Sequence, residues 1–421
     1  MGLQQLAPLI IESLRKGIPP DDGVAHYSVG NESLIDGIKR FHLSGIGDRG
    51  IIRFISGHWG TGKTHLFRLL REVAFHEGCL VSSVELNVDA AALNRFERVF
   101  YSIISHIATP ESHRSGSSTD AAPMGLVLKE TLGFLGSGSR DGSASTSHEQ
   151  FQRACTALMA DHGIDIDFKK MVQEYWKTFL PESSQPAIIE QTRGEIVQWF
   201  SGEGTIGAYR KRFGIGKMVS KDNAKLMLQS LAGFVHLAGY RGLLILFDEA
   251  ETSYSVMRKS QLKDAHNNLL SLINNIEALK GLFLIYATTP DFYNDPKHGI
   301  VIYGALAGRI GKPADTPPRA LDTVWNLDAV KHSLQEYQAA ARKIRTIYVA
   351  AFPESPSVVP TEAALDKFVA EVEAQHPPLS NVQFWRVLVT GVVAHLDNCL
   401  QGDVRPTTKV YENVMDRLRE D

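Results

Sequence analysis

Residues 57–64 read Gly-His-Trp-Gly-Thr-Gly-Lys-Thr and match the phosphate-binding pattern G-x-x-x-x-G-K-[ST], which constrains the fold of this chain more than any other feature. A β-branched run at 51–56 precedes the pattern, and 65–74 repeats apolar residues at helical spacing. We therefore expect a strand, a loop and a helix in direct succession. The alternative is a glycine-rich turn without a ligand, and the complete pattern in its matching context disfavours that alternative.

This loop is expected to bind the phosphates of a nucleotide. Its glycines let backbone N–H groups, together with the N-terminus of the following helix, approach an anion closely. Lys63 adds a positive charge at the β- and γ-phosphates and is a candidate catalytic residue, while the hydroxyl of Thr64 is the expected ligand of Mg2+. The predicted nucleotide-binding residues of this segment are Gly57, His58, Trp59, Gly60, Thr61, Gly62, Lys63, Thr64 and His65.

The composition is that of a globular protein with more than one folded unit. The chain has 421 residues, and at about 150 residues per domain this length predicts two or three units. A net charge of −3 gives no general attraction to nucleic acid, so any contact with DNA must be local. The three cysteines lie far apart, which argues against a zinc site or a disulfide framework and favours the reducing cytoplasm.

No association with a membrane is expected. No apolar run approaches the ~18 residues that a spanning helix needs, and the N-terminus has no signal-peptide pattern. The first segment instead places Leu3, Leu6, Ile10 and Leu14 on one face of a helix. We interpret this segment as a helix that packs on the core.

Residues 108–225 are predicted to form a largely helical insertion into the nucleotide-binding domain. Serine- and glycine-rich segments at 115–118 and 136–143 bracket a short helix near its start. Near its end, 209–217 is basic and interrupted by glycines. The charges of this run are Arg210, Lys211, Arg212 and Lys217. A solvated surface is the default interpretation of such a run, and a contact with DNA or with a partner protein is the alternative.

A second apolar run, 243–247, ends in two acids, Asp248 and Glu249. A central parallel strand is buried on both faces, which accounts for five consecutive apolar residues, and ligands bind at the carboxyl ends of such strands. We predict that Asp248 binds Mg2+ through water and that Glu249 orients and polarises the attacking water, as in a Walker B motif. The alternative is a polar strand end without a chemical role.

Together these motifs resemble a known family. Residues 57–65, the run 238–251 and the basic stretch 210–215 are similar to the P-loop ATP-binding proteins of the BREX phage-defence systems, of the BrxD-like type. The stretch near 110–145 lies outside this resemblance. More distantly, the chain resembles AAA+ ATPases of the Orc/Cdc6 initiator type. The resemblance implies an α/β P-loop NTPase fold, with a parallel sheet flanked by helices, a helical insertion and a C-terminal helical lid.

The AAA+ resemblance implies roles for residues outside the two Walker motifs. In such ATPases a segment ahead of the P-loop strand covers the adenine, so Tyr27, Val29 and Gly30 are candidates for base contacts, with an ordinary turn as the alternative. A polar residue at the end of the third apolar strand would lie between the acidic strand and the P-loop strand. Thr288 or Thr289 would then position the attacking water as sensor 1, with Thr289 as our candidate, unless this is a strand end without a role.

Two arginines are candidates for contacts with the nucleotide phosphates. Arg309, among small and apolar residues, would reach the γ-phosphate of a neighbouring subunit as an arginine finger, which implies a homo-oligomer. The alternative is a plain interface or surface arginine. Arg386, on the third of four helices predicted near the C-terminus, would return to the phosphates as sensor 2. The alternative there is an arginine that faces solvent.

We therefore predict an N-terminal helical lead-in at 1–45, a P-loop ATPase domain at 46–318 and a C-terminal helical lid domain at 319–421. We expect the lid to be entirely helical. Its predicted helices lie near 328–352, 361–374, 381–400 and 407–419.

The predicted function is the binding and hydrolysis of ATP with Mg2+, coupled to conformational change or assembly on DNA or on a defence partner such as a helicase. A second interpretation is a nucleotide-gated DNA- or protein-binding module with little turnover, and a third is a signalling ATPase of the STAND type. Glu249 and Arg309 bear on the first two, because both would serve hydrolysis. The third would require a fused sensor, and no repeat array is visible at either end.

Overall fold

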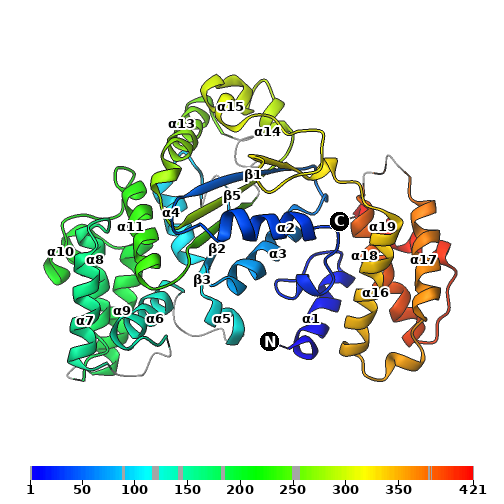
Figure 1. Cartoon of the computed structure of the whole chain (residues 1–421), viewed down its shortest axis with the longest axis horizontal. Coiled ribbons are helices and arrows are strands. Elements are labelled where there is room, and N and C mark those ends of the chain that lie inside the picture. Colours follow the sequence, from blue (N-terminus) through cyan, green and yellow to red (C-terminus); the bar gives the residue numbers. More distant parts are fainter. Residues whose placement is uncertain are drawn as a thin grey trace. The chain divides into compact units, whose positions relative to one another are not determined.

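The computed structural model describes residues 2–87, 91–115, 123–140, 146–181, 185–248, 257–377, 380 and 382–420. It contains a six-stranded sheet with the order β3-β2-β4-β5-β1-β6 (Figure 1). The strands are β1 (Ile51–Ser56), β2 (Leu80–Glu85), β3 (Ile107–Ala108), β4 (Leu243–Asp248), β5 (Leu282–Thr288) and β6 (Val324–Asn326). The order places β5 between β4 and β1, which confirms the position predicted for the third apolar strand.

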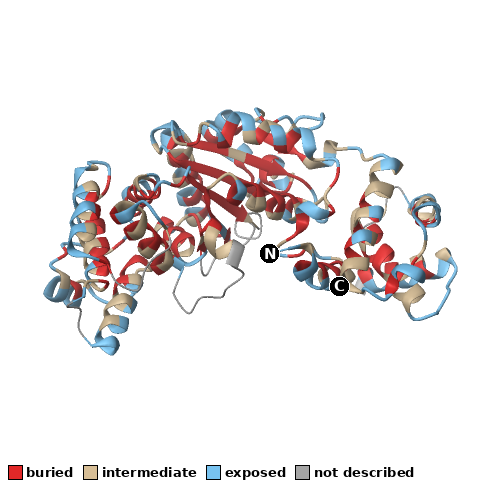
Figure 2. Ribbon diagram, turned by 60° about the horizontal axis from the view of Figure 1, so that its bottom comes forward, coloured by how far each residue is buried: buried red, intermediate tan, exposed pale blue. Residues whose placement is uncertain are grey.

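The strands β2, β4 and β5 are parallel neighbours, and two of them are buried almost completely. Leu80 of β2 pairs with Leu243 of β4, which in turn pairs with Leu282 of β5. Every residue of β5 is buried, and in β4 only the terminal Asp248 is partly exposed (Figure 2). Because parallel strands are covered on both faces, they are apolar throughout, and the two apolar runs form these strands as predicted. The short β3 pairs antiparallel with β2. Because β3 has only two residues, the sequence contains no pattern that would predict this strand.

Contacts between residues divide the chain into two compact units. We call the first the loop unit, which combines 1–38, 55–73 and 313–421, and the second the sheet unit, which consists of 39–54 and 74–312. The loop unit thus joins the N-terminal lead-in, the predicted phosphate-binding loop and the C-terminal region. Within the described part of the chain, no helix combines the length and the apolar character needed to cross a bilayer.

In the loop unit, the N-terminal segment forms the predicted helix, and this helix packs on the C-terminal helices. The helices are α1 (Leu3–Arg15), α2 (Glu32–Ile38), α3 (Lys63–His76), α16 (Leu334–Ala351), α17 (Glu362–Gln375), α18 (Phe384–Leu400) and α19 (Thr407–Glu420), with 3-10 turns η1 (Val24–His26), η5 (Leu327–Ala329) and η6 (Ser355–Ser357). The buried face of α1 contacts α16 and α18. Arg15 donates two hydrogen bonds, of 2.8 and 3.0 Å, to the carboxylate of Asp397, which also accepts one from the hydroxyl of Tyr348 at 2.8 Å.

The C-terminal region is not entirely helical, which corrects the prediction. Its first element is β6, and the helix predicted to begin near residue 328 begins at Leu334. Ser333 and Glu336 form a capping box, in which each side chain accepts a hydrogen bond from the backbone N–H of the other residue. This exchange satisfies N–H groups that the first helical turn leaves unpaired, so the helix starts there. A three-residue strand such as β6 is too short to show alternation.

The sheet unit contains the predicted insertion, whose described secondary-structure elements from α5 to α10 are all helices. The described helices of the whole sheet unit are α4 (Phe96–Ser105), α5 (Pro110–Ser115), α6 (Pro123–Ser137), α7 (His148–Ala160), α8 (Ile166–Lys177), α9 (Pro186–Phe200), α10 (Ile206–Phe213), α11 (Ala224–Leu237), α13 (Lys259–Asn275), α14 (Asp291–Asn294) and α15 (Gly304–Ile310), with a π-helical turn η2 (Lys39–Leu43) and 3-10 turns η3 (Ile276–Ala278) and η4 (Ile300–Ile302). The first residue of the predicted insertion belongs to β3 instead. The rings of Phe168 and Trp176, both on α8, pack against the ring of Phe234 on α11.

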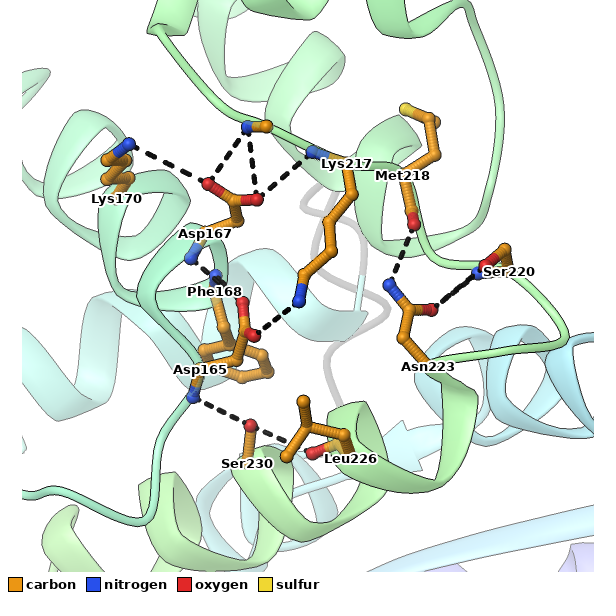
Figure 3. A network of polar contacts seen from close by, with 11 residues as sticks. Asp165, Asp167, Phe168, Lys170, Lys217, Met218, Ser220, Asn223, Leu226 and Ser230 are labelled. Atoms are coloured by element: carbon orange, nitrogen blue, oxygen red, sulfur yellow. Dashed lines mark hydrogen bonds and ion pairs between the residues drawn. The ribbon is translucent and has the colours of Figure 1, made fainter.

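The helix α8 holds the loop that follows α10 (Figure 3). The side chain of Asp165 caps α8 by accepting hydrogen bonds from the N–H groups of Asp167 and Phe168. Asp167, which is 4% exposed, accepts hydrogen bonds from the backbone N–H groups of Gly216 (3.0 Å) and Lys217 (3.1 Å). A carboxylate of the protein therefore satisfies two successive amides of this loop.

Two of the four basic side chains in 209–217 are paired with carboxylates. Arg212 forms an ion pair with Glu195, and Nζ of Lys217 lies 3.1 Å from the carboxylate of Asp165. Because these partners already neutralise the two cations, the charge available to a phosphate backbone is smaller than the sequence alone indicates. The pairing favours the default interpretation of this run, a solvated surface, over a contact with DNA.

We predict that replacing Asp167 by alanine lowers the free energy of unfolding by about 2–4 kcal/mol, because two backbone N–H groups lose their buried acceptor. Urea unfolding followed by circular dichroism measures the change. Asp222→Ala is the matched control, since Asp222 is exposed and such surface changes stay within about 0.5 kcal/mol. Equal stabilities of the two variants would contradict the role given to Asp167.

Candidate nucleotide-binding site

The segment 57–64, which we now call the P-loop, joins β1 directly to α3. Gly60 and Gly62 have φ angles of +80° and +97°, in a region that glycine adopts without strain. A side chain on Gly57 would collide with the hydroxyl of Thr61. The shape of the loop therefore requires the two glycines of the pattern, Gly57 and Gly62, and also Gly60 between them.

Lys63 is drawn back over the P-loop. Its Nζ donates hydrogen bonds to the carbonyl oxygens of Gly57 (2.7 Å) and His58 (3.2 Å), and the residue is 8% exposed. Nζ also lies 5.5 Å from the centre of the Trp59 ring, while 61% of Trp59 is exposed. The loop thus holds a nearly buried positive charge against its own backbone, where the β- and γ-phosphates of a nucleotide are expected.

The start of α3 fits a bound Mg–nucleotide. Thr64 is exposed in the first turn, so its hydroxyl is accessible, and that turn contains no acidic residue that would repel an anion. Among the residues that the structure describes, no group of three or more His, Cys, Asp or Glu side chains is placed to hold a metal. Mg2+ usually takes most of its ligands from water and phosphate, so a single hydroxyl is a fitting contribution from this loop.

The lead-in segment contacts the first turn of α3 through His65. One ring nitrogen of His65, Nδ1, lies 3.4 Å from the hydroxyl of Tyr27, and the other, Nε2, lies 3.0 Å from the hydroxyl of Ser28. Tyr27 is buried, and its ring meets the His65 ring edge-on at 5.3 Å. Burial lowers the pKa of His65 to about 4, so its imidazole is neutral at physiological pH. The side chain of Tyr27 is thus engaged in fixing the P-loop helix.

Gly30, the third residue predicted to contact the base, lies against the C-terminal helix α16. It has a φ angle of +76°, and a Cβ atom there would stand 2.9 Å from Oε1 of Glu336 and 3.2 Å from Nδ1 of His332. Nζ of Lys343 donates a hydrogen bond to the carbonyl of Ser28 at 2.7 Å. The backbone of the lead-in is therefore held between the P-loop helix and α16.

Two residues that the sequence did not single out contact the P-loop from the C-terminal region. The carboxylate of Asp328 accepts hydrogen bonds from the backbone N–H of His58 at 3.1 and 3.3 Å and lies 2.9 Å from its Nδ1. Gln383, the residue before α18, has its Cγ 2.8 Å from the position of a Cβ on Gly60. Both lie more than 250 residues from the loop in sequence, so no local pattern could have found them.

The predicted sensor 2 residue, Arg386, lies in the first turn of α18 and is half-buried. Its Cγ and Nε lie 3.2 and 3.3 Å from the position of a Cβ on Gly17. Gln383, the residue before α18, is the one that approaches the P-loop at Gly60, three residues ahead of Arg386. The role of Arg386 in phosphate binding remains a prediction.

The sheet unit carries the other predicted catalytic residues. Asp248 ends β4, and Thr288 ends β5, its parallel neighbour, so both stand at the same edge of the sheet. The hydroxyl of the fully buried Thr288 donates a hydrogen bond to the hydroxyl of Tyr293 at 3.0 Å. Thr289 follows it and is also buried, whereas Glu249 lies outside the described residues. The structure thus brings the acidic strand end and the threonines to one edge.

Arg309 lies in the last turn of the short helix α15, which packs on α13. It is exposed, and it forms no ion pair or hydrogen bond with the residues that the structure describes. This position is compatible with an arginine that is presented to another molecule. A surface arginine without a role would be placed in the same way, so the assignment as a finger remains a prediction.

A strand, a glycine loop enclosing a lysine, and a helix form a site of the phosphate-binding class. The sequence matches the family described as BREX system ATP-binding protein BrxC/D over residues 4–414, and the chain belongs to this family. Membership confirms the predicted resemblance to the BREX ATP-binding proteins, and the match also spans the stretch near 110–145, which the prediction had left outside it. It also supports ATP binding and a place among the proteins of the BREX defence system. No curated protein matches the chain in sequence.

We predict that stability falls as the pH decreases from about 6.5 to about 4, and that His65 contributes about 3 kcal/mol to this loss. The unfolded chain takes up a proton on His65 near pH 6.5, whereas the folded protein resists protonation until about pH 4. Acidification therefore favours the unfolded state. Urea unfolding between pH 7 and pH 4 should be less dependent on pH in His65→Gln than in the wild type.

His76→Gln is the control for this measurement, because His76 ends the same helix and is exposed. The control should retain the pH dependence of the wild type. If His65→Gln also retained it, the conclusion that His65 is neutral at physiological pH would be wrong.

Proposed function

We propose that this protein is an AAA+-like P-loop ATPase that binds Mg–ATP at residues 57–64 and hydrolyses it. The observation that carries the proposal is the position of Lys63. Its ammonium group donates hydrogen bonds to the carbonyls of Gly57 and His58, inside a loop whose shape depends on its glycines. Family membership supports ATP as the nucleotide. Burying a positive charge costs free energy, and a role in phosphate binding accounts for the nearly buried ammonium group of Lys63.

The proposed division of roles follows the chemistry of each group. The backbone amides at the start of α3 and the ammonium of Lys63 bind the phosphates, while Thr64 and Asp248 hold Mg2+, which neutralises charge on the β- and γ-phosphates when bound. Glu249 orients and polarises the attacking water, with Thr289 as its second contact. Arg386 binds the phosphates from α18. Tyr27, Val29 and Gly30 remain the residues that we propose to line the base site. Of the three, Gly30 has no side chain and could contact the base only through its backbone.

We further propose that nucleotide exchange and hydrolysis move the C-terminal region. The lead-in, the P-loop and the C-terminal region belong to one compact unit, and Asp328, Gln383 and Lys343 contact the P-loop or the lead-in directly. A change in the P-loop would therefore alter contacts of the C-terminal region. DNA, or another BREX protein such as a helicase, is the proposed object of this movement. Because Arg212 and Lys217 are already paired with carboxylates of the protein, a protein partner is favoured over DNA.

Binding and turnover are predicted to depend on different residues. Lys63→Ala should weaken ATP binding by roughly 100-fold, because it removes charge-assisted hydrogen bonds to the phosphates. Glu249→Gln should keep the wild-type affinity and lose hydrolysis, because it leaves the phosphate contacts intact. Calorimetry with ATP and steady-state phosphate release measure the two properties, with exposed Lys367→Ala as a control.

Equal affinity of Lys63→Ala and wild type would refute the P-loop assignment. Undiminished turnover in Glu249→Gln would mean that another group orients the water. A wild type that binds ATP without any turnover would favour the nucleotide-gated binding module.

We propose that Arg309 acts on the nucleotide of a neighbouring subunit in a homo-oligomer. Arg309→Ala should then bind ATP normally and hydrolyse it about 10³-fold more slowly, as is typical for such arginines. Mixed with Lys63→Ala, it should recover part of the activity, because one subunit supplies the intact P-loop and the other supplies the arginine. Absence of recovery in demonstrated mixed assemblies would show that Arg309 does not act across subunits.

A further inference from the structure

The carboxylate of Asp328 lies at the part of the P-loop that surrounds Lys63. Its two oxygens accept hydrogen bonds from the backbone N–H of His58, at 3.1 and 3.3 Å, and one of them lies 2.9 Å from Nδ1 of the His58 imidazole. The carbonyl of the same residue, His58, accepts hydrogen bonds from Nζ of Lys63 at 3.2 Å and from the hydroxyl of Thr61 at 2.9 Å. His58 thus contacts Asp328 through its backbone N–H and Lys63 through its backbone carbonyl.

The position of Asp328 is fixed by the fold. The side chain of Asn326, at the end of β6, accepts a hydrogen bond from the backbone N–H of Asp328 at 3.1 Å and donates one to the carbonyl of Ala314 at 2.8 Å. Leu327 also packs close to Gly57, since its Cβ lies 3.4 Å from the position of a Cβ on that glycine. Asp328 is therefore a built contact with the P-loop.

A carboxylate at this place has an electrostatic consequence. The P-loop lysine reaches the β- and γ-phosphates, so the terminal phosphate of ATP would come close to Lys63 and His58, and hence to Asp328. ADP lacks that phosphate. Because charges of the same sign repel each other over several ångströms at a partly exposed site, Asp328 opposes ATP more strongly than ADP.

We propose that Asp328 is a specificity-determining residue that lowers the preference of the site for ATP over ADP. It does so from the C-terminal region, through its contact with His58. This inference rests on the proposed function of the P-loop. It gives the C-terminal region a means to register the terminal phosphate, because entry of that phosphate weakens the hold of Asp328 on His58, whereas ADP leaves it in place.

The test measures the affinities of ADP and of a non-hydrolysable ATP analogue, both with Mg2+, by calorimetry. Asp328→Asn keeps the size of the side chain and an acceptor for the N–H of His58, but removes the charge. It should raise the ratio of ATP-analogue affinity to ADP affinity by about threefold to tenfold. Asp328→Ala should also raise the ratio. A looser loop would lower the affinities for both nucleotides, but the ratio compares two affinities of the same variant.

Asp322→Asn is the matched control. Asp322 lies in the same segment, with a side chain 30% exposed against 26% for Asp328, and its partner is Arg319. It should leave the ratio unchanged. A merely structural role of Asp328 would weaken both nucleotides equally, and an unchanged ratio in both Asp328 variants would overturn the inference.

The same titrations separate this inference from the proposed function. If the wild type bound neither nucleotide, or if Lys63→Ala bound both as well as the wild type does, the proposed function and the inference would fail together. If Lys63→Ala lost binding while the Asp328 variants kept the wild-type ratio, only the inference would fail.

Discussion

The ammonium group of Lys63, held by two carbonyl oxygens of its own loop, is the interaction on which the rest of this site depends. A lysine can lie this deep only because the loop curves around it, and the loop can curve only because Gly60 and Gly62 adopt positive φ angles. The loop in turn sits between a strand of the sheet and the N-terminus of α3. The charge, the backbone amides and the helix end therefore converge on one place, where an anion is favoured.

The segments around the P-loop come from opposite ends of the chain. The lead-in reaches it through the hydrogen bonds of His65 with Tyr27 and Ser28, and the C-terminal region reaches it through Asp328 and Gln383. These contacts lie within one compact unit, although hundreds of residues separate its parts in sequence. A nucleotide site built in this way is sensitive to the position of the C-terminal helices, and the reverse also holds because coupling between two sites is reciprocal.

Much of this arrangement was predictable from the sequence, since strong local patterns carry it. The P-loop, the two apolar strands, the acidic strand end and most helices follow from spacing and composition, and the predicted family is correct. The strand β6 and the contact of Asp328 with His58 were not predictable. The first is too short to show a period, and the second joins residues that only the folded chain brings together. The ion pairs of Arg212 with Glu195 and of Lys217 with Asp165 were not predictable either, because each joins residues that are distant in sequence.

The most direct test of the account is an experimental structure of the protein with Mg2+ and a non-hydrolysable ATP analogue. The account predicts that the β-phosphate lies within hydrogen-bonding distance of the backbone amides at 62–64, and that Nζ of Lys63 leaves the carbonyl of Gly57 or His58 to contact the β- and γ-phosphates. A nucleotide bound elsewhere, with the ammonium of Lys63 still on both carbonyls, would contradict it.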